Sequence, residues 1–157
     1  MPVDIVLTPT ISTGIYAAGD AIGGKLTFTN GAVIGGRGGT ITKVVIIDDD
    51  KELAPIDLVL FNQDFTATAD NAAFDPTDAD LENCIGYISM AATDYASFND
   101  NSVATKTSGL QMPFAFELGG ASLYGQMVVR SAPTYTAVTD LTVRITLAWP
   151  IEWLSRR

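Results

Sequence analysis

The chain has 157 residues, of which 47% are hydrophobic and 17% are charged, and its formal net charge is −9. This composition excludes a disordered chain, and the length suits a single domain that buries its own core. The negative charge argues against direct binding to the phosphates of a nucleic acid. We therefore expect one domain over 1–157, with 150–157 as a candidate C-terminal arm.

Short strands are predicted along the first part of the chain. Residues 4–8, 24–29 and 40–47 combine β-branched and aromatic residues with period-2 alternation, and 56–61 is a continuous apolar run. The 40–47 segment begins with alternation, becomes apolar on both faces and stops at three aspartates. Such segments are typical of strands with one or both faces buried.

A long acidic excursion follows residue 61. Over 64–83 it carries spaced aspartates and two isolated phenylalanines, Phe65 and Phe74. Within it, 75–83 is the one helical candidate, with Asp75 suited to the N-cap and Pro76 to the first helical position. A hard cation such as Ca²⁺ could use these carboxylates, but the spacing of an EF-hand loop is not met. Turn chemistry and a solvated acidic surface explain them better, so we expect no metal site.

Period-2 patterning returns in the second half of the chain. Residues 85–90, 103–107, 112–116 and 124–130 are expected strands. The clearest strand is 141–149, because every second residue from Leu141 to Trp149 is apolar and Pro150 ends its hydrogen bonding. Lys and Glu, which are common on helix surfaces, are scarce. Eight or nine strands with one short helix therefore predict an all-β sandwich or barrel.

The missing histidines restrict the chemistry of the chain. Without histidine, and with Cys84 as the only cysteine, histidine-dependent triads, the usual zinc sites and intrachain disulfides are excluded. The Gly-rich segment 35–39 lacks the spacing of a P-loop or a dinucleotide-binding motif. We expect no catalytic residue, no cofactor and no enzyme activity. Cys84 itself is expected to be a buried thiol on a strand.

The sequence shows no membrane or export signal. No apolar run is long enough to span a bilayer, and the first four residues lack the basic and apolar parts of a signal peptide. We therefore expect a protein that is made and kept in a cytoplasm, or assembled there, without a membrane partner.

Several aromatic side chains lie near predicted strand ends or loops. They are Tyr16, Tyr95, Phe98, Tyr124, Tyr135 and Trp153. Exposed aromatics on a β-sandwich could bind sugars or a protein partner, although packing in the core or at an edge explains most of them. Trp149 is expected in the core, whereas Trp153 is the better candidate for an interface anchor.

Three stretches carry a resemblance to a known group of proteins. They are the Y-x-x-G-D-x-x-G-G segment at 16–24, the excursion LVLFNQDFTATADNAAFDPTDADL at 58–81, and the alternating strand LTVRITLAW at 141–149. Together they resemble small structural proteins of tailed bacteriophages, and the pattern covers most of the chain. Similar phage proteins serve as capsid decoration (cement) proteins, which typically form jelly-roll-like sandwiches and assemble as dimers or trimers on the shell.

The resemblance implies a jelly-roll-like antiparallel β-sandwich that belongs to the virion and is assembled in the host cytoplasm. The implied function is capsid decoration, in which the protein bridges major capsid subunits. Its implied partners are other copies of the chain and the major capsid protein. The residues expected at these interfaces are Asp64, Phe65, Phe74, Asp75, Tyr95, Trp153, Arg156 and Arg157. A tail or connector protein of the virion and a carbohydrate-binding sandwich remain alternatives.

Overall fold

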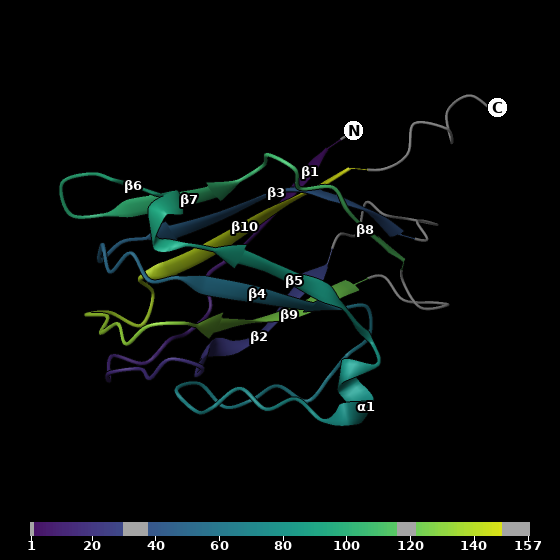
Figure 1. The fold of residues 1–157 in the computed structure, drawn as a ribbon, viewed down its shortest axis with the longest axis horizontal. Helices are drawn as coiled ribbons and strands as arrows, with labels where there is room; N and C mark the ends of the chain where they lie inside the picture. Colours follow the sequence, from purple (N-terminus) through teal and green to yellow (C-terminus); the bar gives the residue numbers. More distant parts are fainter. Residues whose placement is uncertain (1, 30–37, 116–121, 149–157) are drawn as a thin grey trace.

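The computed structural model describes residues 2–29, 38–115 and 122–148, which form two antiparallel sheets (Figure 1). The first sheet has the order β1 (Val3–Leu7), β10 (Leu141–Ala148), β3 (Gly38–Asp48), β7 (Ser102–Lys106) and β6 (Tyr95–Ser97), and β8 (Met112–Ala115) also pairs with β3. The second sheet has the order β2 (Ala21–Thr29), β9 (Ser122–Val129), β4 (Ile56–Phe61) and β5 (Cys84–Met90). The expected all-β antiparallel sandwich is confirmed.

The strands pair as a nested series, which is the strand order of a jelly roll. In sequence order, β1 pairs with β10, β2 with β9, β3 with β7 and β8, and β4 with β5. Successive pairs alternate between the two sheets, as in a long antiparallel hairpin that is rolled up on itself. Each sheet is therefore built from segments that lie far apart in the sequence.

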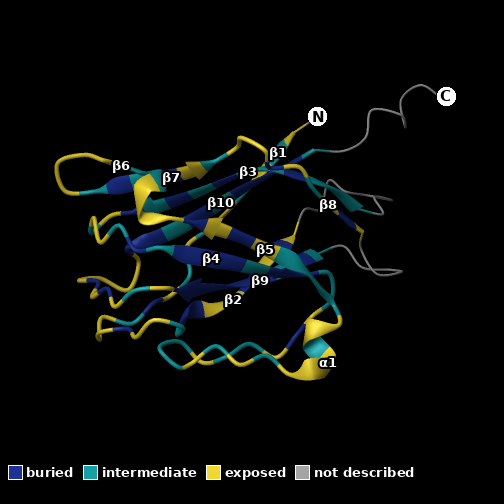
Figure 2. Cartoon of the chain, viewed as in Figure 1, coloured by how far each residue is buried: buried dark blue, intermediate teal, exposed yellow. Residues whose placement is uncertain are grey.

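The core lies between the two sheets, and the alternation in the sequence marks the side chains that form it. On β10, Leu141, Val143, Ile145 and Leu147 are almost completely buried, whereas Arg144 between them is partly exposed. Burial also alternates along β1 and over the second half of β3, whereas β4 and β9 in the middle of the second sheet are mostly buried on both faces (Figure 2). Trp149, which was expected in the core, lies outside the described residues.

The short helix differs from the prediction. α1 spans Asp78–Leu81, and its N-cap is Thr77, whose hydroxyl accepts a hydrogen bond from the Asp80 amide at 3.1 Å. The expectation that Asp75 caps a helix over 75–83 is therefore wrong. The Asp75 amide instead donates to the Thr68 hydroxyl at 3.1 Å, so this residue belongs to the preceding loop.

Three other details of the fold differ from the sequence-based expectations. β6 was not predicted, because three residues are too few to show a period. Cys84 is half-buried and not buried, and it lies at the start of β5, where it pairs with Phe61. β2 begins at Ala21 and contains Gly23, whose φ of +75° allows an irregularity in the pairing with β9.

Candidate functional site

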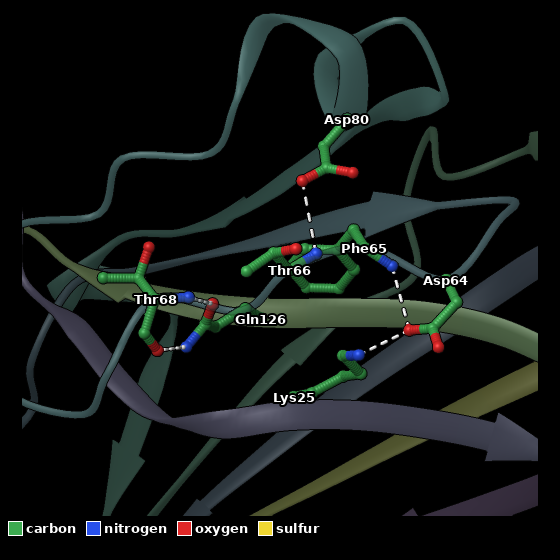
Figure 3. Close-up of polar contacts among 7 residues, drawn as sticks. All are labelled: Lys25, Asp64, Phe65, Thr66, Thr68, Asp80 and Gln126. Carbon is green, nitrogen blue, oxygen red and sulfur yellow. Dashed lines mark hydrogen bonds and ion pairs between the residues drawn. The ribbon is translucent and has the colours of Figure 1, made fainter.

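The acidic excursion folds back onto the second sheet, and Gln126 of β9 is the centre of this contact (Figure 3). The Gln126 side chain is completely buried. Its Nε2 donates to the carbonyls of Thr68 at 2.7 Å and Gly23 at 3.0 Å, and its Oε1 accepts from the Thr68 amide at 3.0 Å. One side chain therefore joins the excursion to both β9 and β2.

An aromatic pair closes the beginning of the excursion. Phe65 is buried, and its ring stacks on Phe61 with 4.1 Å between the ring centroids. The ammonium group of Lys25 lies 5.4 Å from the centroid of Phe65 and forms an ion pair with Asp64. This hydrogen-bonded ion pair holds the pKa of the Asp64 carboxyl below its usual value. The Phe65 ring and the Asp64 carboxylate thus both contact other side chains of this chain, Phe61 and Lys25.

The excursion also lies along the segment that precedes β2, so two of the stretches behind the phage resemblance interlock. The Asp70 carboxylate accepts from the Gly23 amide at 2.6 Å and from the Tyr16 hydroxyl at 2.7 Å. Asp20 forms an antiparallel bridge with Ala73, and main-chain hydrogen bonds continue on both sides of this bridge. The excursion thereby covers part of the open edge of β2. Within the Y-x-x-G-D-x-x-G-G pattern, these contacts use Tyr16, Asp20 and Gly23.

Replacing Asp70 with alanine should lower the free energy of unfolding by about 2 kcal/mol, because the Gly23 amide and the buried Tyr16 hydroxyl would lose their acceptor. Equilibrium denaturation in urea measures this change. Asp75→Ala is the matched control, since Asp75 is an exposed residue of the same excursion. Equal effects of the two substitutions would contradict the anchoring role of Asp70.

A second polar cluster closes the turn after β3. The completely buried Asp48 carboxylate accepts from the amides of Asp50 and Leu53, both at 3.0 Å, and from the Ser102 hydroxyl at 3.5 Å. Burial raises the pKa of Asp48, and the amides of 50–53 partly offset this effect. The carboxylate is therefore engaged inside the fold and does not face a ligand.

The candidate aromatic residues divide into buried and exposed ones. Tyr16 and Tyr135 are buried and meet edge to face with 6.3 Å between the ring centroids. Tyr95 is half-buried, and its hydroxyl donates to the Ala54 carbonyl at 2.8 Å. Burial raises the pKa of all three phenols well above the usual value. Phe98 differs from them, because 56% of its surface is exposed.

The residues expected at an interface lie on different parts of the fold. Asp64, Phe65, Phe74 and Asp75 follow one another along the excursion, whereas Tyr95 begins β6 in the other sheet. Asp64 and Asp75 are exposed, Phe74 is half-buried and Phe65 is enclosed. Trp153, Arg156 and Arg157 lie outside the described residues. A role for these eight residues at an interface stays a prediction.

The sequence-based reasoning did not single out Gln126, Ile15 or Val138. Gln126 is a polar residue between Gly125 and the apolar end of β9, and such a residue must find hydrogen-bond partners when it is buried. Ile15 and Val138 are large aliphatic residues among small and polar loop residues, and they are 68% and 47% exposed. The signal that could have identified these residues is a side chain whose polarity differs from that of its neighbours in the sequence.

Comparisons with protein-family models, with curated proteins and with solved structures find no match to this chain. Within 2–29, 38–115 and 122–148, no group of three or more Asp, Glu or Cys side chains is arranged to hold a metal ion. No helix in the same ranges is long and apolar enough to cross a bilayer. The polar clusters around Asp48, Asp70 and Gln126 each join segments of this chain.

Proposed function

We propose that this chain is a non-enzymatic structural protein of a tailed-phage virion, and more specifically a capsid decoration protein. The observation that carries the proposal is the jelly-roll strand order, because jelly rolls recur in viral capsid proteins. This support is an analogy of fold. The second support is the resemblance of 16–24, 58–81 and 141–149 to small phage structural proteins.

The way the chain uses its polar residues also supports a binding role. An enzyme needs polar groups that converge on a pocket where a substrate can lie. Here Asp48, Asp70 and Gln126 instead hold turns and loops of the chain in place. Because these three side chains are engaged within the chain, a partner would contact other residues on the surface.

The mechanism of decoration follows from binding equilibria. A protein that binds the assembled shell but not its free subunits stabilises the shell by mass action. A dimer or trimer that contacts several capsid subunits at once would be retained more strongly than any single contact allows. Hydrogen bonds hold the excursion against the second sheet, so it would meet a neighbour with its exposed surface and not as a free loop.

Sedimentation with capsid shells tests the proposed function. The shells are assembled from the major capsid protein encoded in the same genome, and the unassembled capsid protein is the control. We expect saturable binding at a stoichiometry set by the symmetry of the shell, together with a higher melting temperature of the shell. Saturation at the copy number of a ring would favour the connector alternative. A lack of binding, or a genome without a major capsid protein, would contradict capsid decoration.

Carbohydrate binding is the second candidate function, because two tyrosines share the outer face of the second sheet. Tyr87 is 63% exposed and lies opposite Val59, and the half-buried Tyr124 lies opposite Phe61. Residues 59 and 61 are two apart on β4, so both tyrosines lie on one face. Glycan-array binding that Tyr87→Ala and Tyr124→Ala abolish, but Phe98→Ala preserves, would favour this function. The absence of any glycan signal would count against it.

A further inference from the structure

Three of the exposed large apolar side chains lie in loops at one end of the sandwich. Ile15, Phe98 and Val138 are 68%, 56% and 47% exposed, and they lie in the loops that join β1 to β2, β6 to β7 and β9 to β10. These loops and the β3–β4 loop are at the left end of Figure 1, where Figure 2 shows mainly exposed residues. We name this surface the loop end, and it consists of residues 11–16, 48–53, 98–101 and 133–140.

Main-chain hydrogen bonds join two of these loops next to their exposed apolar residues. The Ile11 amide donates to the Val138 carbonyl at 3.0 Å. The Tyr16 amide, directly after Ile15, donates to the Pro133 carbonyl at 3.1 Å. The backbone at Ile15 and Val138 is therefore held in place, and the two side chains stand on one connected surface.

The other two loops are joined to the same surface. The Asp49 amide donates to the Asp140 carbonyl at 2.8 Å, and the Lys51 ammonium donates to the Phe98 carbonyl at 2.7 Å. The Phe98 amide donates to the Asn101 carbonyl at 2.8 Å, which closes the tip of the β6–β7 loop. Because the loops are ordered before any contact is made, a partner would lose little free energy in ordering them.

The loop end is acidic as well as apolar. Asp49, Glu52 and Asp100 are exposed there. Lys51 is the only basic residue in the four segments, and its ammonium is already bonded to the carbonyls of Phe98 and Asn99. Acidic groups around apolar side chains complement a surface that is basic and has apolar depressions.

We propose that the loop end is a docking surface for a protein partner whose contact surface is basic and carries apolar pockets. Ile15, Phe98 and Val138 are the anchors that enter these pockets, and the carboxylates form the charged rim. Phosphate backbones and anionic lipid headgroups are repelled by this acidic surface, which favours a protein over a nucleic acid or a membrane. The inference deepens the proposed function and rests on it only for the identity of the partner as a capsid shell.

Serine substitutions test the apolar anchors. Phe98→Ser and Val138→Ser should each weaken binding to the assembled shells by about tenfold or more. Val6→Ser and Leu81→Ser are the matched controls, because these residues are both 46% exposed but lie on β1 and α1. Each control should change the dissociation constant by less than about twofold. Similar effects in both sets, or no effect in either, would overturn the proposal.

Paired asparagine substitutions test the charged rim. Asp49→Asn combined with Asp100→Asn removes two exposed carboxylates from the loop end. We expect binding about threefold weaker at low ionic strength and a smaller dependence on salt. Asp78→Asn combined with Glu82→Gln removes the same charge from α1 and its C-cap, and it should change neither quantity. Tighter binding after the first pair would indicate an acidic partner and would overturn the proposal.

A second probe separates failure of the loop end from failure of the proposed function. If the unaltered chain does not bind the shells, the capsid assignment is rejected, and a displayed library of short random peptides is then selected on the same chain. We expect selected peptides rich in Lys, Arg and large apolar residues that lose affinity for Phe98→Ser but keep it for Val6→Ser. A selection that yields no peptide, or peptides that bind both variants equally, would overturn the docking surface. If the shells do bind but the loop-end variants bind them equally well, only the loop-end proposal fails.

Discussion

Replacing Asp48 with alanine is expected to lower the free energy of unfolding by about 4 kcal/mol, the largest effect that we predict for one side chain. The carboxylate accepts from two amides in the turn after β3, at Asp50 and Leu53. It also holds Lys51 and Leu53 at φ values of 55° and 52°, where residues other than glycine are uncommon. Without the carboxylate, the amides lose their acceptor in the interior and the strained turn loses its support.

Thermal and urea denaturation measure the effect of Asp48→Ala. A loss of this size should lower the melting temperature by roughly 10 °C in a chain of this length. Asp49→Ala is the matched control, because the adjacent Asp49 side chain is exposed and should change the free energy of unfolding by less than about 0.5 kcal/mol. If the two alanine variants unfold alike, the carboxylate of Asp48 does not organise the turn.

Asp48 should also give the stability a characteristic dependence on pH. Burial raises its pKa in the folded chain above the value in the unfolded chain, so the folded state binds this proton more tightly. The wild type therefore gains stability as the pH falls through the folded pKa, and the gain is complete below the unfolded pKa. The stability difference between the wild type and Asp48→Ala should widen from neutral pH toward a pH of about 4. A narrowing difference would mean that the amides outweigh burial.

Replacing Gln126 with alanine is expected to lower the free energy of unfolding by about 3 kcal/mol. The substitution leaves the amide and carbonyl of Thr68 and the carbonyl of Gly23 without the partner that joins the excursion to the sheet. Hydrogen exchange should show the loss locally, because the Thr68 amide would exchange faster than in the wild type. The excursion would then open more readily than the rest of the sandwich.

Two variants make the Gln126 experiment specific. Gln111→Ala is the control for removing a glutamine, because Gln111 is exposed and should have little effect. In Gln126→Glu a carboxylate would face the carbonyls of Thr68 and Gly23, so its proton would be bound more tightly in the folded chain. This variant should therefore recover stability as the pH is lowered. If the stability of Gln126→Glu does not change with pH, the side chain at 126 does not face the carbonyls of Thr68 and Gly23 as described.

The elements with a strong local signal could be predicted from the sequence. The alternation over 141–148 identified both the strand and its buried face, since a period of two places alternate side chains on opposite sides. Elements set by distant contacts could not be predicted. The start of α1 is one example, because the Thr68 hydroxyl engages the Asp75 amide and the cap moves to Thr77. The bridge between the excursion and the residue before β2 is another, since Asp20 and Ala73 lie far apart in the chain.

By itself, the sequence determined the class of the fold and the chemistry that is excluded, because strand periodicity and the absence of histidine are local properties of the chain. Only the tertiary structure decided the role of each acidic residue. Asp48 and Asp49 are neighbours with the same side chain, yet one closes a buried turn and the other faces solvent. The nested pairing of strands determines which positions are buried and which distant groups come into contact, such as Gln126 with Thr68. A local sequence pattern does not specify such long-range contacts.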